Sequence, residues 1–272
     1  MVADHLDGSW AIVDCRFDLQ NAGWGHEQYL AAHVPGAVYA GLARDLSGAK
    51  TGHNGRHPLP SLDEMAAAFS RFGIDSRVQV VVYDQDIGTF ASRLWWMLRY
   101  AGHEAVAVLD GGMARWLAEG RPVRSGEQSR PEAVFVPSPR PELLASVAEV
   151  EAASATGDRL LVDARSPDRF AGRSETIDKA AGHIPGAVNR FYTQNAAADG
   201  TLLAPDVLRD AFVDVLGGRD PGDVVMYCGS GVTACHNLLA MEHAGLPGAR
   251  LYPGSWSEWS SDPKRPVETG DA

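Results

Sequence analysis

Cysteine is scarce in this sequence of 272 residues, where only Cys15, Cys228 and Cys235 occur. An odd, sparse set of cysteines argues against a disulfide framework and favours a reducing compartment such as the cytoplasm. Clusters of lysine and arginine are also missing, and the formal net charge is −11. We therefore expect neither a nucleic-acid-binding surface nor a surface that binds anionic membranes.

Long apolar runs are absent as well. No stretch of about 18 apolar residues occurs, so no transmembrane helix is expected. Residues 1–7 lack the basic and apolar segments of a secretory signal. The sequence instead has an ordinary globular composition, with 45% hydrophobic residues. A chain of this length and composition suggests about two domains, each with its own core.

The most informative stretch is residues 224–235, which read VVMYCGSGVTAC. The short apolar run fits a buried strand that ends before Cys228, and Gly229 and Gly231 permit the backbone angles of a tight loop. Apolar residues at helical spacing then predict a helix that begins near Thr233. Cys228 is therefore expected in a loop at the N-terminus of a helix.

A thiol in such a loop is a candidate nucleophile. Backbone N–H groups that point inward, together with the helix dipole, favour the thiolate form of Cys228. The alternative is a buried structural cysteine, because free cysteines are among the most buried residues. The two glycines and Ser230 favour the nucleophile, because core packing does not require a Gly-Ser-Gly segment.

A long internal repeat defines the organisation of the chain. VDCR at residues 13–16 and HVPGAV at 33–38 recur as VDAR at 162–165 and HIPGAV at 183–188. A repeat spaced by about 150 residues indicates a duplicated domain. Strand and helix patterns alternate in both halves, with connections long enough for parallel strands. We predict an α/β fold with two tandem domains, each a parallel-sheet core flanked by helices.

Five prolines between residues 120 and 141 indicate an extended linker. We place a first domain at residues 1–123, the linker at 124–141 and a second domain at 142–272. Phe135 and its valine neighbours are expected to hold the linker against a domain surface. The counterpart of Cys228 in the first domain is Asp84, so only the second domain is predicted to be catalytic.

These features together resemble the tandem-domain rhodanese, or sulfurtransferase, family over nearly the whole chain. The loop CGSGVTA at 228–234 is similar to the active loop of 3-mercaptopyruvate sulfurtransferases, whereas members that use thiosulfate carry cationic residues just after the cysteine. Supporting motifs are WWM at 95–97, GH at 102–103, LDGG at 109–112 and GSWSEW at 254–259.

The resemblance implies two tandem rhodanese-like domains and a ping-pong reaction. Cys228 would take the outer sulfur of a small anionic donor as a persulfide and pass it to cyanide or to a thiol, such as thioredoxin or a small thiol. Neither a metal nor an organic cofactor is implied. A thiosulfate donor with the same intermediate, and a sulfur-relay or regulatory binding module, are the alternatives. The loop residues expected to act in catalysis or to contact the donor are Ser230, Gly229, Gly231, Val232 and Thr233.

Arg169 matches the arginine that binds the donor's anionic group in this family. A guanidinium holds a carboxylate or sulfonate through two parallel hydrogen bonds; the alternative is a solvated charge on a helix. The second arginine that mercaptopyruvate enzymes carry before the GHIPG segment is missing, and Asp178 stands near its place. We predict that Arg173 or Lys179 substitutes for it. Arg165 is expected to pair with the end of its own strand.

His33 matches the family's first-half histidine, which can form a proton relay with Ser230. His33 and His183 occupy equivalent positions of the repeat, however, so a role in the fold of each half is the favoured interpretation. Cys235 is expected in the core of its helix, with a resolving thiol as the alternative. A phosphatase would need an arginine six residues after the cysteine, where Ala234 stands.

Overall fold

The computed structural model describes residues 2–271, which form two compact units. Unit 1 comprises residues 2–48, 60–140 and 198–202, and unit 2 comprises 49–59, 141–197 and 203–271. The units change at residue 141, inside the linker predicted at 124–141. Residues 49–59 interrupt the first half and pack with unit 2. This short segment contributes to the site described below.

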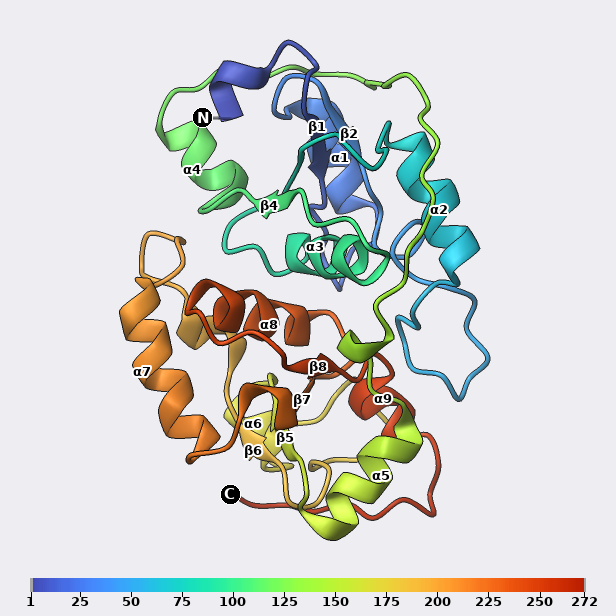
Figure 1. Ribbon diagram of the computed structural model, residues 1–272, viewed down its shortest axis with the longest axis vertical. Coiled ribbons are helices and arrows are strands. Elements are labelled where there is room, and N and C mark those ends of the chain that lie inside the picture. Colours follow the sequence, from blue (N-terminus) through green and yellow to red (C-terminus); the bar gives the residue numbers. More distant parts are fainter. Residues whose placement is uncertain (1, 272) are drawn as a thin grey trace. The chain divides into compact units, whose positions relative to one another are not determined.

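Unit 1 is an α/β unit around one parallel sheet (Figure 1). Its strands pair in the order β2-β1-β3-β4. In chain order its elements are η1 (Val2–His5), β1 (Ala11–Asp14), α1 (Trp24–Ala31), β2 (Ala37–Tyr39), α2 (Leu62–Arg71), β3 (Val80–Tyr83), α3 (Ala91–Tyr100), β4 (Val106–Val108) and α4 (Gly112–Ala118).

Unit 2 repeats this plan, with strand order β6-β5-β7-β8 and all pairs parallel. Its elements are η2 (Pro141–Leu143), α5 (Val147–Thr156), β5 (Leu160–Asp163), α6 (Pro167–Phe170), β6 (Val188–Asn189), η3 (Tyr192–Asn195), α7 (Pro205–Leu216), η4 (Pro221–Asp223), β7 (Val224–Tyr227), α8 (Thr233–His243), β8 (Arg250–Leu251) and α9 (Ser255–Trp259). The predicted α/β class with two tandem parallel-sheet domains is confirmed.

Local sequence explains where several helices begin and end. Ser61 and Ser146 cap α2 and α5, and each forms a reciprocal capping box with the glutamate three residues on. Helix α7 starts with Pro205, whose ring fits the first helical turn. It ends at Gly217, which adopts the left-handed conformation typical of helix C-termini.

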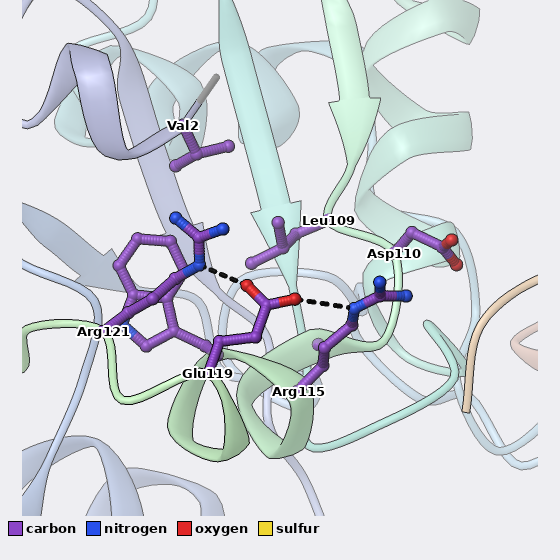
Figure 2. A pocket seen from close by; sticks show the side chains of 8 residues that line it. Val2, Leu109, Asp110, Arg115, Glu119 and Arg121 are labelled. Carbon is purple, nitrogen blue, oxygen red and sulfur yellow. Dashed lines mark hydrogen bonds and ion pairs between the residues drawn. The ribbon is translucent and has the colours of Figure 1, made fainter. Parts of the chain in front are cut away.

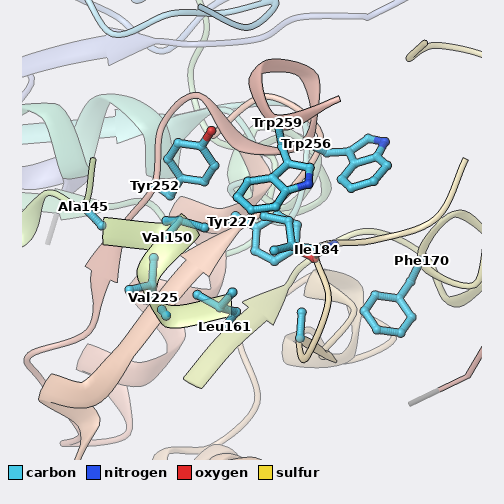
Figure 3. Packing of buried hydrophobic residues seen from close by; sticks show 12 residues of the cluster. Ala145, Val150, Leu161, Phe170, Ile184, Val225, Tyr227, Tyr252, Trp256 and Trp259 are labelled. Atoms are coloured by element: carbon cyan, nitrogen blue, oxygen red, sulfur yellow. Dashed lines mark hydrogen bonds between the residues drawn. The ribbon is translucent and has the colours of Figure 1, made fainter. Parts of the chain in front are cut away.

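The core of unit 2 lies on one face of its sheet. Figure 3 shows Tyr227, Trp256 and Trp259 together above the strands, and each is 1% exposed or less. Helices α5 and α9 supply the other side of this layer through residues such as Val150 and Trp256. Because side chains alternate along a strand, Val224 and Met226 point to the opposite face, and both are buried as well. Strand β7 is thus buried on both faces, as parallel strands usually are.

Equivalent buried ion pairs lie at the C-terminal end of the first strand of each unit. Arg16 pairs with Asp14 at 2.6 Å and also donates to the carbonyl of Ala32 at 2.6 Å. In unit 2, Arg165 pairs with Asp163 at 2.7 Å and donates to the carbonyl of Gly182 at 2.7 Å. Arg165 therefore pairs with the end of its own strand, as expected from the sequence.

One aromatic side chain of the linker packs into unit 1, and backbone hydrogen bonds such as that from Ser138 to Ala101 hold the linker alongside. Phe135 is 6% exposed and packs edge-on against Phe69 with ring centroids 5.0 Å apart. Its neighbours Val134 and Val136 are 79% and 74% exposed. The expectation for Phe135 is therefore confirmed, and that for the valines is wrong, because an extended chain turns alternate side chains away from the surface. In residues 2–271, no helix is long and apolar enough to span a bilayer.

Candidate active site

Cys228 lies where β7 ends and before α8 begins, in the predicted strand–loop–helix arrangement. Its thiol is buried, and the backbone N–H of Gly231 donates to Sγ over 3.2 Å. Gly231 has a φ of +74°, and an added Cβ would lie 2.3 Å from the carbonyl oxygen of Pro253. Only glycine fits there. The loop thus turns a hydrogen-bond donor onto the sulfur, as backbone nests do for anions.

Helix α9 fixes the backbone of this loop. The N–H groups of Trp256 and Ser257 donate to the carbonyls of Cys228 and Gly229, each over 2.9 Å. The hydroxyl of Ser255 accepts the N–H of Cys228 at 3.1 Å and donates to the carbonyl of Tyr252 at 2.9 Å. Ser255 has a φ of 54° and is the only non-glycine residue with positive φ in the described part of the chain. Strained backbone of this kind is typical of functional sites.

Ser230 has a histidine partner that sequence reasoning missed. Nδ1 of His57 lies 2.9 Å from Oγ of Ser230, and both residues are buried. His57 belongs to segment 49–59, which packs within unit 2. The two residues are 173 positions apart in the sequence. A buried serine and histidine in hydrogen-bond contact can relay a proton.

Arg56, the neighbour of His57, is a second residue that sequence reasoning missed. Its backbone N–H donates to Oγ of Ser257 at 3.0 Å, and its guanidinium forms an ion pair with Asp178. An ideal Cβ on Gly229 would lie 2.8 Å from Nη2 of Arg56. A cation therefore lies beside the residue that follows Cys228.

Arg169 also lies beside Gly229, and its contact with the donor stays a prediction. Its Nη1 is 3.4 Å from the ideal Cβ of Gly229. Its other side-chain nitrogens pair with Glu175 at 2.9 Å and with Asp178 at 3.0 Å. Burial opposes the ionisation of Glu175, but hydrogen bonds from the amides of Asp178 and Ile177 and from Arg169 together lower the pKa of its carboxyl. Glu175 is thus a charged anchor for Arg169.

Comparison with known proteins agrees with this arrangement. A model of the rhodanese-like domain matches residues 2–119 and 146–262. The chain belongs to the rhodanese family. A Pseudomonas aeruginosa protein named "Probable 3-mercaptopyruvate sulfurtransferase" is 46% identical over 262 residues, which cover 96% of this chain and 92% of the relative. The "Thiosulfate sulfurtransferase" of Rattus norvegicus is 36% identical, with coverage of 93% of this chain and 84% of the relative.

A solved structure, "3-mercaptopyruvate sulfurtransferase from Leishmania major", superposes with a TM-score of 0.85 at 36% identity. The match covers 95% of this chain and 72% of that one. The present chain is a sulfurtransferase with two rhodanese domains in tandem. Cys228 and its loop lie within the second of these rhodanese-like domains, which spans residues 146–262.

The remaining residues predicted for this rhodanese site lie nearby in the sequence. Val232 is buried, and its carbonyl accepts the N–H of Cys235 at 3.1 Å, while Thr233 is the first residue of α8. Arg173 is exposed and pairs with Asp168 and Asp271, each at 3.0 Å. Contact of Val232, Thr233 or Arg173 with the donor stays a prediction.

The two repeat histidines make the same kind of contact in their own rhodanese units. Nδ1 of His33 donates to the carbonyl of Tyr29 at 2.7 Å, and Nδ1 of His183 donates to that of Phe170 at 2.8 Å. Each imidazole also stacks on the ring of that residue, with centroids 4.3 Å and 3.7 Å apart. These contacts support a role in the fold, and a role of His33 at the donor stays a prediction. Ser230 has His57 as its histidine partner instead.

Cys235 and the pocket of unit 1 lie outside this chemistry. The thiol of Cys235 is buried in α8 and donates to the carbonyl of Gly231 at 3.3 Å. This hydrogen bond ties α8 to the backbone of Gly231 in the loop that holds Cys228. A role of Cys235 as resolving thiol stays a prediction. Unit 1 contains a cavity of about 320 Å³. Figure 2 shows Glu119 of its lining between Arg115 and Arg121, and Glu119 pairs with both. With Asp110, which also lines the cavity, two acidic side chains balance the two arginines, and we assign the cavity no catalytic role.

Proposed function

We propose that this sulfurtransferase moves the sulfane sulfur of 3-mercaptopyruvate to a thiol or cyanide through a persulfide on Cys228. One observation carries the proposal: the sulfur of Cys228 accepts an amide N–H at 3.2 Å while Arg169 lies beside the next residue. The amide would stabilise an anionic sulfur, and the guanidinium would hold the donor's carboxylate. The amide of Gly231 and the guanidinium of Arg169 would thus contact two ends of one small donor.

In the first half-reaction, the thiolate of Cys228 attacks the sulfur of the donor. A new S–S bond forms and the C–S bond of 3-mercaptopyruvate breaks. The electron pair of that bond leaves on carbon as the enolate of pyruvate, which takes up one proton. In the second half-reaction, cyanide or a thiolate attacks the outer sulfur, and the electron pair of the S–S bond returns to Cys228.

Ser230 and His57 are placed to supply the proton that the enolate needs. Their hydrogen bond of 2.9 Å is buried beside the active loop. We infer that the hydroxyl of Ser230 donates to the enolate and is reprotonated through His57. This role replaces the relay that the resemblance assigned to His33.

Thiosulfate is the second candidate donor, because several relatives carry its name, among them the Rattus norvegicus protein. Its reaction would form the same persulfide, with the electron pair of the donor's S–S bond leaving on sulfite. A dianion needs net positive charge close to its sulfur, whereas Gly229 and Ser230 supply only amides and a hydroxyl, and the arginines beside Gly229 are already paired with Asp178 and Glu175. We therefore favour the monoanion, 3-mercaptopyruvate.

The acceptor is proposed to be a thiol, such as thioredoxin or a small thiol, in the cytoplasm. A reducing compartment suits this chemistry because Cys15, Cys228 and Cys235 are all free. A protein that only relays sulfur or regulates a partner would bind donor without steady turnover. Steady turnover of a small donor distinguishes an enzyme from such a module.

The proposal is tested by mass spectrometry and donor kinetics. Incubation with 3-mercaptopyruvate should add one sulfur atom to the peptide that holds Cys228, and Cys228→Ser should abolish both this mass shift and pyruvate release. Cys15→Ser, which changes another buried free cysteine, is the matched control and should keep both. Faster turnover of thiosulfate at equal low concentration would refute the preferred donor. A sulfur adduct on Cys15 or Cys235 instead would refute the mechanism.

A further inference from the structure

The cavity of about 320 Å³ in unit 1 combines an apolar and a charged lining (Figure 2). Its apolar part comes from Val2 of η1, Leu109 after β4 and Trp116 of α4. Trp116 is buried, and Val2 and Leu109 are half-buried. The charged part consists of four exposed residues, Asp110, Arg115, Glu119 and Arg121. A hollow with an apolar wall and a few polar groups suits a small amphipathic molecule.

The internal repeat shows what fills the same place in unit 2. Leu109 follows β4 and Tyr252 follows β8, which are the equivalent edge strands of the two sheets. The next helices correspond as well, because the indole N–H groups of Trp116 and Trp259 each donate to a proline carbonyl at 2.8 Å. Tyr252 is 1% exposed in the core of unit 2. Tyrosine is larger than leucine, so the ring of Tyr252 fills a volume that unit 1 leaves open beside Leu109.

The cover over this place differs in the same sense. The helix α5 and the 3₁₀ helix η1 each precede the first strand of their unit, and they have 10 and 4 residues. Helix α5 packs on the core through Val150, and its Glu151 pairs with Arg265 at 2.7 Å. From η1, Val2 lines the cavity. The shorter element covers less of the sheet, so the apolar layer of unit 1 ends in a hollow.

The charged part of the cavity has hydrogen-bonding capacity to spare. Glu119 accepts Nε of Arg115 at 2.9 Å and also Nε of Arg121. Within residues 2–271, the terminal N–H₂ groups of these two arginines have no hydrogen-bond partner. Asp110 accepts the N–H of Leu202 on Oδ1 at 2.7 Å, which leaves its second oxygen for another donor. Balanced charges of both signs suit a ligand that itself carries both signs.

We propose that this cavity binds a free aromatic α-amino acid, such as phenylalanine or tyrosine. The ring would lie beside Leu109, just as the ring of Tyr252 fills the equivalent volume of unit 2. Arg115 and Arg121 would hold the carboxylate of the ligand, and Asp110 would accept its ammonium group. The proposal goes beyond sulfur transfer and does not depend on the chemistry of Cys228.

The first test is an NMR titration of the whole chain with L-phenylalanine. The Kd should be on the order of 0.1–1 mM, as suits a ligand of this size. Among the indole N–H signals of the seven tryptophans, the one that shifts should be the signal that Trp116→Phe removes. If no indole signal shifts at about 10 mM L-phenylalanine, which is above the expected Kd, the proposal is overturned.

Two analogues test the need for both charges of the ligand. 3-Phenylpropionate lacks the ammonium group, and phenethylamine lacks the carboxylate. Each should bind at least about tenfold more weakly than L-phenylalanine, because one charge-assisted contact is lost. Equal binding of either analogue would refute the assignment of a zwitterionic ligand.

The residue of unit 2 supplies the decisive variant. Leu109→Tyr should fill the cavity and weaken the binding of L-phenylalanine at least about tenfold, and it should raise the midpoint of thermal unfolding by about 2–4 °C. Leu117→Tyr is the matched control, because Leu117 belongs to the same helix as Trp116 but is 51% exposed and outside the cavity lining. It should keep the wild-type Kd.

If Leu109→Tyr does not fold, Arg121→Gln on the exposed edge of the cavity supplies the measurement. It should weaken L-phenylalanine by about tenfold and leave phenethylamine, which has no carboxylate, nearly unchanged. A wild-type Kd for L-phenylalanine in either folded variant would show that the amino acid binds elsewhere, and would overturn the assignment of this cavity.

Discussion

The loops that follow β3 and β7 are two versions of one structure. Residues 84–90 connect β3 to α3, and residues 228–232 connect β7 to α8, so the loop of unit 1 is two residues longer. In unit 1, the carboxylate of Asp84 accepts the amides of residues 86, 88, 90 and 91 at 2.7 to 3.2 Å. In unit 2, the thiol of Cys228 accepts the amide of Gly231. The loop of unit 1 thus directs its amides at a carboxyl group of its own.

The helix that packs behind each loop is also repeated. The N–H groups of Met113 and Ala114 donate to the carbonyls of Asp84 and Gln85 at 2.9 Å and 3.0 Å. Trp256 and Ser257 make the equivalent bonds to Cys228 and Gly229. Both helices begin at a residue with a φ of 54°, which is Gly112 in one unit and Ser255 in the other.

The difference in loop length accounts for the different residues at the start of the two helices. A Cβ on Gly112 would lie 2.7 Å from the carbonyl oxygens of Asp84 and Asp86, so the longer loop excludes any side chain there. The shorter loop of unit 2 leaves room for Ser255, whose hydroxyl binds the N–H of Cys228. Unit 1 satisfies the amides of its loop with Asp84, whereas unit 2 has at the same place the thiol of Cys228, which we propose as the sulfur carrier.

The comparison predicts that exchanging the thiol for the carboxylate of unit 1 yields an inactive but folded protein. Cys228→Asp should lose at least about a thousandfold in turnover, because no persulfide can form on a carboxylate. The carboxylate can accept the amide of Gly231, so thermal unfolding should stay close to that of wild-type protein. Pyruvate release and calorimetry measure the two effects. Turnover within about tenfold of wild type would show that the sulfur is carried elsewhere.

Much of this site was predictable from the sequence, because its central features are local. The apolar run before Cys228 and the glycines after it specify a strand and a tight loop, and Pro205 and the serine caps mark helix starts. Arg169 lies on the short helix α6, six residues before Glu175, and the resemblance identified it directly.

His57 and Arg56 were not predictable in the same way. They lie in segment 49–59, which has no helix or strand and no hydrophobic periodicity, and their partners are 173 and 122 residues away. No local rule specifies such contacts. The one available signal was an arginine and a histidine side by side in a loop of glycine and proline, which is an unusual place for charge without a partner.

A second prediction concerns the stability of the loop in unit 1. Burial raises the pKa of Asp84 to about 6, although amide hydrogen bonds from residues such as Phe90 oppose this shift. A carboxyl with a raised folded pKa stabilises the fold in its protonated form, and this contribution disappears as pH rises through about 6. Relative to Asp84→Asn, wild-type protein should therefore lose about 2–3 kcal/mol of unfolding free energy between about pH 4 and pH 7.

Denaturant unfolding of both proteins at a series of pH values measures this difference. Asp86→Asn, an exposed change in the same loop, should show no comparable dependence on pH. If wild-type protein instead gains stability over Asp84→Asn as pH rises, the four amides outweigh burial, and the carboxylate of Asp84 is the stabilising form.

The smallest expected effect tests the strained position at the start of α9. Alanine normally stabilises a protein relative to glycine, because it restricts the unfolded chain. At Ser255 the order should reverse: Ser255→Gly should be about 1 kcal/mol more stable than Ser255→Ala, because only glycine adopts positive φ without strain. Both variants should turn over donor about several-fold more slowly, since the N–H of Cys228 loses its partner. Ser260, a buried serine at the end of the same helix with a φ of −73°, is the matched control. There the alanine variant should be the more stable of the pair. The same order at Ser255 would mean that its left-handed backbone stores no strain, and the contrast with Gly112 would then reflect loop length alone.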